Sequence, residues 1–194
     1  MRGQIIYLMG PSGSGKDALL ETVRRLSDGR LRVARRITTR GGAADAETRE
    51  YEESVDPADF SARAKAGDFS LSWNAHGIEY GIPKEIDAWT RDGLHVLVNG
   101  SRAYFPEARR RYPDLRAVLL RVSAEVLRER LRARNRETPE EISSRLERNE
   151  RFQKEFAPPP LPSEEFLILD NSGLLSHTAR QLLDFIHAPA LLCA

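Results

Sequence analysis

Eight residues near the N-terminus, Gly10 to Asp17, constrain the fold of this chain more than any other stretch. They follow an apolar run at 5–9 that has the pattern of a strand buried on both faces, and they precede a helical apolar period at 18–26. Strand, glycine-rich turn and helix predict a phosphate-binding loop, because the backbone N–H groups turn inward and the helix N-terminus adds positive charge. Lys16 is placed to reach the β- and γ-phosphates of a bound nucleotide. The predicted nucleotide-binding residues are Gly10, Pro11, Ser12, Gly13, Ser14, Gly15, Lys16 and Asp17.

The last loop position departs from the usual motif, in which a Ser or Thr hydroxyl ligates magnesium. This chain has Asp17 there, and it has Asn99 where an acid is commonly found at the end of a neighbouring strand. We infer that the carboxylate has moved from one side of the metal to the other, which makes Asp17 the expected Mg²⁺ ligand. The alternative is that Asp17 is only an acid in the first turn of a helix, favoured by the helix dipole.

The composition is that of an ordinary globular protein, with 40% hydrophobic and 30% charged residues among 194. A formal net charge of +1 gives no reason to expect nucleic acid or a membrane as the main partner. The single cysteine, Cys193, excludes an intramolecular disulfide and a multi-cysteine metal site. No apolar run has transmembrane length and no signal-peptide pattern precedes the first strand, so we expect a cytoplasmic protein. The sequence does not predict the oligomeric state.

The order of the expected elements indicates an α/β fold: a three-layer P-loop kinase domain with a parallel central sheet, a small acceptor-binding subdomain and a helical lid. We predict one domain over residues 1–188, followed by a tail at 189–194. Within this domain, the expected core is 1–34, 93–122 and 163–188, the acceptor subdomain is 35–92, and the lid is 123–156.

Two segments supply candidates for binding an anionic acceptor. An Arg- and Thr-rich segment follows the second expected strand, and polar residues follow the strand at 94–98, where ligands of open α/β sheets collect. A solvated basic edge would also explain the first segment, and an Asn-Gly turn with an exposed arginine would explain the second. The aromatic residues of the segment at 68–80 can face a ligand or form the core of a small subdomain. The candidates are Arg36, Thr39, Arg40, Trp73, Tyr80, Asn99, Ser101 and Arg102.

Two arginine-bearing helices are expected after residue 123, with a break before the capping box that starts at Thr138. They resemble a lid that closes over phosphates, although a charge run of this kind is more usually a solvated face. The lid arginines expected to stabilise a transferred phosphoryl group are Arg130, Arg134 and Arg145.

In the order of its motifs, the chain resembles the guanylate kinase branch of the nucleoside monophosphate kinases. The matching motifs are G-P-S-G-S-G-K at 10–16, T-T-R at 38–40, Tyr80-Gly81, and R-L-x-x-R from Arg130 to Arg134. The resemblance implies ATP-dependent phosphoryl transfer, and it places Asn171 where that family contacts the adenine of ATP.

The departures from guanylate kinases change the expected acceptor. The stretch at 69–73 lacks the acid that reads guanine, and Ile82 and Asn99 replace an expected hydroxyl residue and an expected acid. A guanine pocket without a carboxylate would leave N–H donors of the base unpaired. With L-S-W-N-A-H-G-I-E-Y-G at 71–81 and V-L-V-N-G-S-R at 96–102, the chain is similar to the ribose 1,5-bisphosphate phosphokinases of phosphonate catabolism.

This second resemblance implies phosphorylation of ribose 1,5-bisphosphate to 5-phosphoribosyl 1-diphosphate, with a small phosphorylated sugar as the partner. The acceptor oxygen is a phosphate oxygen that is ionised at neutral pH, so no general base is expected. Two further functions stay open at this point: a nucleoside monophosphate kinase, and a non-catalytic interaction module with a guanylate-kinase-like fold.

Overall fold

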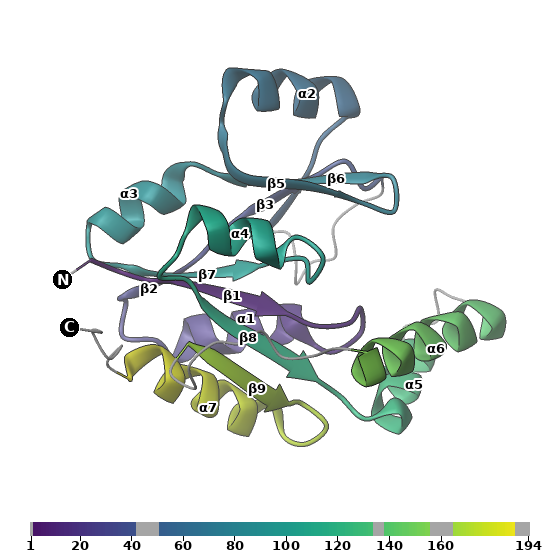
Figure 1. The fold of residues 1–194 in the computed structure, drawn as a ribbon. Coiled ribbons are helices and arrows are strands. Elements are labelled where there is room, and N and C mark those ends of the chain that lie inside the picture. Colours follow the sequence, from purple (N-terminus) through teal and green to yellow (C-terminus); the bar gives the residue numbers. More distant parts are fainter. Residues whose placement is uncertain (1, 42–50, 134–137, 156–164, 189–194) are drawn as a thin grey trace.

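The computed structural model describes residues 2–41, 51–133, 138–155 and 165–188 (Figure 1). In the view of Figure 1, the helices of the expected lid lie to the right of the central sheet, and a smaller sheet lies above the central sheet. Among the described helices, none is long and apolar enough to cross a bilayer. The expected tail at 189–194 and the end of the expected lid lie outside the described residues.

The central sheet is parallel throughout, with the strand order β2-β7-β1-β8-β9. Its middle strands β7, β1 and β8 have continuous apolar residues at their centres and are buried on both faces, as the sequence predicts for a sheet covered by helices. The strands are β1 (Ile5–Met9), β2 (Leu31–Val33), β7 (His95–Asn99), β8 (Arg116–Arg121) and β9 (Phe166–Asp170).

Helices cover both faces of this sheet, which confirms the three-layer α/β prediction. One apolar cluster joins Ile6 and Leu8 to helices α1 (Lys16–Leu26) and α7 (Leu175–His187). The other joins Ile5, Tyr7 and Met9 to α3 (Glu85–Arg91) and α4 (Phe105–Arg111). Alternation along β1 therefore divides its side chains between the two layers.

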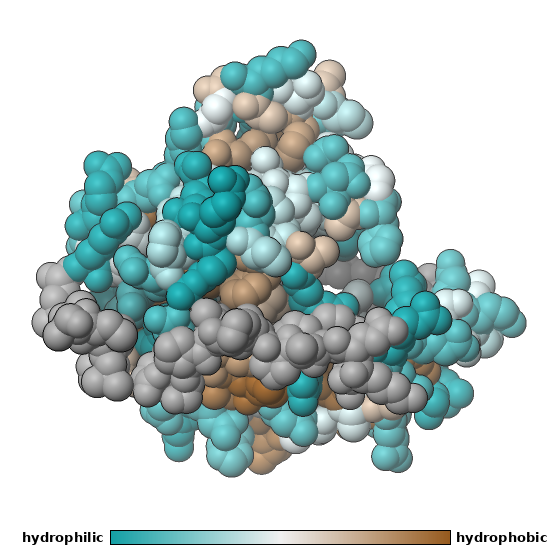
Figure 2. Space-filling model, in the orientation of Figure 1, coloured by the Kyte–Doolittle hydropathy of each residue, from teal (hydrophilic) through white to brown (hydrophobic). Residues whose placement is uncertain are grey.

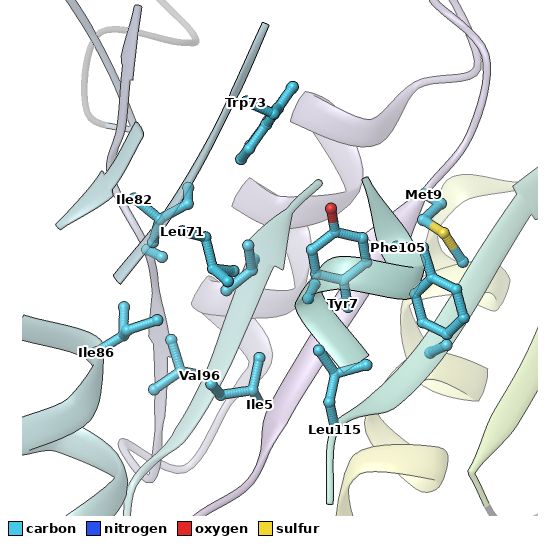
Figure 3. Packing of buried hydrophobic residues seen from close by; sticks show 14 of the residues in the cluster. Ile5, Tyr7, Met9, Leu71, Trp73, Ile82, Ile86, Val96, Phe105 and Leu115 are labelled. Carbon is cyan, nitrogen blue, oxygen red and sulfur yellow. The ribbon is translucent and has the colours of Figure 1, made fainter. Parts of the chain in front are cut away.

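The second cluster extends without interruption into the acceptor subdomain. Leu71, Trp73 and Ile82 belong to the same cluster as Tyr7 and Val96 (Figure 3). The subdomain is thus fixed to the core through shared apolar side chains. Its four-stranded sheet has the order β4-β3-β6-β5, and α2 lies above this sheet in Figure 1. The elements are β3 (Arg36–Thr38), β4 (Glu52–Ser54), α2 (Pro57–Ala66), β5 (Phe69–Ala75) and β6 (Ile78–Pro83).

Strand β4 forms from a polar segment whose sequence has no alternating apolar pattern. Its residues pair in parallel with β3, from Arg36 opposite Glu52 to Thr38 opposite Ser54. The polar residues of β4 have little strand propensity of their own, so this strand forms because its backbone can pair with the edge of β3. The subdomain sheet is for that reason mixed, because its other described pairs are antiparallel.

The lid consists of helices α5 (Ala124–Ala133) and α6 (Pro139–Glu155). Leu127 and Leu131 of α5 pack against Ile142 and Leu146 of α6, so the pair has a small core of its own. The predicted capping box is present: the Thr138 N–H donates to Glu141 and the Glu141 N–H donates to the Thr138 hydroxyl. The outer surface of the two helices is largely hydrophilic (Figure 2).

Candidate active site

The phosphate loop (residues 10–17) joins the end of β1 to the start of α1, as the sequence predicts. Gly13 and Gly15 adopt the left-handed conformation, with φ of 89° and 88°. A Cβ on Gly15 would lie 2.6 Å from Nδ2 of Asn171, and one on Gly13 would lie 2.8 Å from Cδ1 of Leu127. The loop is therefore enclosed by α5 and by the segment after β9, and glycine is needed at both positions.

Lys16 is held across the loop. Its ammonium donates to the carbonyl oxygens of Gly10 and Pro11, each at 2.9 Å. The lysine charge is therefore already at the mouth of the loop, where phosphate oxygens can replace the carbonyls as acceptors.

Two predicted residues from distant segments meet at the carbonyl of Ser14. This oxygen accepts a hydrogen bond from Nδ2 of Asn171 at 2.8 Å and one from Nη1 of Arg130 at 3.3 Å. Nη2 of Arg130 also donates to the carbonyl of Asn171 at 2.8 Å. Asn171 is only 1% exposed. In this structure both residues support the loop, and an adenine contact of Asn171 stays a prediction.

The second lid helix also reaches the loop. Nη1 of Arg145 donates to the Ser12 hydroxyl at 2.8 Å. Arg130 and Arg145 thus approach the loop from different helices, as the sequence predicts for lid arginines. Arg134, the third expected lid arginine, lies outside the described residues.

Asp17 and Asn99 lie side by side. Nδ2 of Asn99, the last residue of β7, donates to Oδ1 of Asp17, in the first turn of α1, at 3.3 Å. Asn99 is 5% exposed, and its Oδ1 is buried with no hydrogen-bond partner among the described residues. One carboxylate and one orphaned amide oxygen beside a phosphate loop are the oxygen donors that Mg²⁺ accepts together with nucleotide phosphates. Within the described ranges no group of three His, Cys, Asp or Glu side chains could hold a metal by itself.

On the acceptor side, Arg40 and Tyr80 form a unit. Nη2 of Arg40 donates to the Tyr80 hydroxyl at 2.9 Å. Burial disfavours the charge of the guanidinium, but the neighbouring Tyr80, Glu52 and Asp17 outweigh the burial and raise the pKa of Arg40. Arg40 is thus a permanent cation that faces the same region as Asp17.

Arg36 has a partner that the sequence analysis missed. Its guanidinium forms an ion pair with Glu52 and lies over the Tyr80 ring, 5.2 Å from the centroid. Glu52 belongs to the short polar strand β4, and its parallel pairing with β3 puts it beside Arg36. Thr39 is also engaged, because its hydroxyl accepts from the Glu79 N–H at 2.9 Å.

Trp73 and Tyr80 are largely core residues, which was the second interpretation of the aromatic segment. Trp73 stacks between Tyr80 and Tyr104, with ring centroids 5.4 Å apart in both pairs. The exposed fractions of Trp73 and Tyr80 are 8% and 7%. The polar edge of Tyr80 nevertheless belongs to the site, since its hydroxyl binds Arg40.

The acceptor loop (residues 99–102) follows β7, next to the phosphate loop. The Ser101 backbone is bonded to the hydroxyl of Tyr7, a residue that the sequence analysis treated only as part of an apolar strand. Burial lowers the pKa of Arg102 to about 10.

A second unpredicted contact connects the acceptor subdomain with the core. The hydroxyl of Tyr51, just before β4, donates to Glu21 on α1. This hydrogen bond, followed by those from Arg24 and Arg25, lowers the pKa of Glu21 to about 2. Glu21 is one helical turn beyond Asp17, so Tyr51 also lies on the active-site side of α1.

The chain is similar to several known proteins over most of its length. A family described as an AAA domain matches residues 6–154. A protein of Pseudomonas paraeruginosa named ribose 1,5-bisphosphate phosphokinase PhnN is 50% identical over 187 residues, covering 96% of each chain. A protein of Azotobacter vinelandii with the same name is 49% identical over 191 residues, covering 98% of this chain and 99% of its own.

Two solved structures share the fold. A guanylate kinase from Anaplasma phagocytophilum matches with a TM-score of 0.69 at 18% identity, covering 96% of this chain and 86% of its own. A gluconokinase from Sinorhizobium meliloti matches with a TM-score of 0.52 at 20% identity, covering 95% and 91%.

Proposed function

The chain belongs to the family of ribose 1,5-bisphosphate phosphokinases, and from this membership we propose that it transfers the γ-phosphoryl group of ATP to ribose 1,5-bisphosphate. The products are ADP and 5-phosphoribosyl 1-diphosphate, and the reaction serves phosphonate degradation in the cytoplasm. Identity near 50% over almost the whole of both chains is the observation that carries the proposal. The phosphate loop and the cationic acceptor side supply the parts that such a transfer needs.

On the donor side, the phosphate loop binds the ATP phosphates through its backbone N–H groups. Lys16 exchanges its bonds to Gly10 and Pro11 for bonds to phosphate oxygens. Arg145 and Arg130 are already on the loop, and together with Arg134 they neutralise charge on the transferred group as the lid (123–156) closes.

Asp17 and Asn99 would hold Mg²⁺ through the carboxylate and the orphaned Oδ1. A bound Mg²⁺ would neutralise negative charge on the nucleotide phosphates. The hydrogen bond keeps the two side chains next to each other, and a neutral Asn99 leaves less negative charge beside the acceptor than two acids would.

On the acceptor side, residues 35–92 present Arg40 and the Tyr80 hydroxyl to the 1-phosphate, with Arg36 and Thr39 as further partners. Trp73 supports the Tyr80 ring by stacking. The ribose and its 5-phosphate lie against Asn99, Ser101 and Arg102.

The chemical step is an in-line displacement. An ionised oxygen of the 1-phosphate forms a bond to the γ-phosphorus while the bond to the bridging oxygen of ADP breaks. No proton has to leave the nucleophile. The site residues therefore position the two substrates and neutralise the phosphate charge, and none of them acts as a base.

A coupled ADP-release assay with ribose 1,5-bisphosphate, GMP, AMP and gluconate tests the proposal. We expect ribose 1,5-bisphosphate to have the highest kcat/KM by a wide margin. If the kcat/KM for GMP equals or exceeds that for ribose 1,5-bisphosphate, the chain is a nucleoside monophosphate kinase instead. The absence of ATP binding in calorimetry would favour an interaction module.

A further inference from the structure

We infer that Tyr7 is a positioning residue for the acceptor: it fixes the acceptor loop, and through it Asn99 and Arg102, for binding the phosphorylated sugar. The inference rests on the proposed role of that loop. Tyr7 lies on β1, shortly before the phosphate loop, and none of its side chain is exposed.

Two hydrogen bonds connect the Tyr7 hydroxyl with one residue of the loop. The hydroxyl accepts from the Ser101 N–H at 2.9 Å and donates to the Ser101 carbonyl at 3.0 Å. A side chain that satisfies both backbone groups of one residue fixes the position and the orientation of that peptide. Burial raises the pKa of Tyr7, so the hydroxyl keeps its proton and can fill both roles.

The Tyr7 ring also packs directly against the backbone of the acceptor loop. A Cβ on Gly100 would lie 2.0 Å from Cζ and 2.4 Å from Cε1 and Cε2 of Tyr7. The Gly100 backbone therefore rests directly on the ring, and its N–H donates to the Leu8 carbonyl at 3.0 Å. Figure 3 shows the ring within the apolar cluster, beside Phe105, whose ring centroid is 5.9 Å away.

The placement of the loop gives these contacts a role beyond folding. Asn99 before Gly100 reaches Asp17, and Arg102 follows Ser101, so the residue that Tyr7 holds lies between two proposed acceptor ligands. Small displacements of such groups weaken binding and transfer strongly, because a misplacement of about 1 Å can cost on the order of 100-fold. If packing were the only role of this residue, the ring of a phenylalanine would serve equally well and the hydroxyl would not be needed.

Tyr7→Phe isolates the hydroxyl, because the ring and its packing are kept. We expect the KM for ribose 1,5-bisphosphate to rise about tenfold, as for the loss of a buried hydrogen-bonding group. The dissociation constant for ATP, measured by calorimetry without Mg²⁺ so that Asn99 does not contribute, should change less than about twofold, since the phosphate loop makes no use of Ser101. A purely structural role would lower the melting temperature without this split between acceptor and nucleotide.

Tyr112→Phe is the matched control. It also removes a tyrosine hydroxyl with a hydrogen bond, here 2.7 Å to Oδ1 of Asp87, but away from the acceptor loop. We expect it to leave the acceptor KM unchanged. Gly100→Ala is the second variant: it keeps the hydroxyl but pushes the loop off the ring, and it should raise the acceptor KM at unchanged ATP affinity.

The outcomes separate the inference from the proposed function. If the wild-type protein does not use ribose 1,5-bisphosphate, the proposed function is wrong, and the same comparison is made with the acceptor that it does use. If Tyr7→Phe leaves the acceptor KM unchanged, or changes it no more than the ATP dissociation constant, the positioning role of Tyr7 is refuted.

Discussion

Asn171→Ala tests whether the Asn171 side chain supports the phosphate loop, as the structure indicates, or reads the adenine base, as the family resemblance implies. In the structure its Nδ2 donates to the Ser14 carbonyl at 2.8 Å, and its side chain is almost fully buried. A residue in this position acts on any nucleotide whose phosphates enter the loop.

The size of the effect follows from the contacts that are lost. Removal of the amide loses one buried hydrogen bond, a cost of about 1 kcal/mol, because the Ser14 carbonyl keeps the 3.3 Å bond from Arg130. The small cavity adds roughly 1 kcal/mol. For a chain of this size, the sum lowers the melting temperature by about 4–8 °C.

The loss of this hydrogen bond also weakens nucleotide binding. ATP must restore the loop conformation that Asn171 no longer holds, so a penalty of about 1–2 kcal/mol weakens binding roughly 5- to 30-fold. Asn171→Asp should be worse than Asn171→Ala, because it places a carboxylate, which only accepts hydrogen bonds, against the Ser14 carbonyl.

The assay is calorimetric titration with ATP and with GTP, alongside thermal unfolding. We expect equal fold losses for the two nucleotides. Asn74→Ala, which removes an exposed asparagine bonded to Glu79, should change neither affinity. A loss confined to ATP would refute the support role and assign Asn171 to the base, and an unchanged melting temperature with unchanged affinity would refute both.

Three further predictions concern the charges of the site. Lys16→Ala should abolish turnover in the ADP-release assay while leaving the circular dichroism spectrum unchanged, and comparable activity in a folded variant would rule out a P-loop kinase. Asp17→Asn should raise the Mg²⁺ concentration for half-maximal rate, and Asp17→Ser combined with Asn99→Asp should recover part of that loss; an unchanged Mg²⁺ titration contradicts the ligand role of Asp17. Because burial lowers the pKa of Arg102 to about 10, its charge is present below that pH and is lost as the pH rises through it. Acceptor affinity measured between about pH 8.5 and 10.5 should therefore fall more steeply in the wild type than in Arg102→Gln, which binds more weakly throughout; parallel pH profiles would contradict a titrating Arg102.

Features with a local cause can be predicted from the amino-acid sequence. The phosphate loop can be predicted because an apolar run, a glycine-rich turn and a helix follow one another within a few residues. The structure confirms that its glycines Gly13 and Gly15 have positive φ. The capping box at Thr138 is local for the same reason. The resemblance of ordered motifs then indicated the fold class, because strand-loop-helix units pack into layers by general rules.

The tertiary structure alone decided which side chains meet. Asn171 and Ser14 are 157 positions apart, Ser101 and Tyr7 are 94 apart, and Asn99 and Asp17 are 82 apart. Each of these meetings depends on which strands are neighbours in the central sheet and in what register they pair, and no local pattern encodes that choice.

The pairing of Arg36 with Glu52 has the same origin in the smaller sheet. Strand β4 has too little propensity of its own to be recognised, and it forms because the edge of β3 satisfies its backbone groups. The residue types therefore determined what chemistry was available, whereas the packing of distant strands decided which of those residues share a site and which support it.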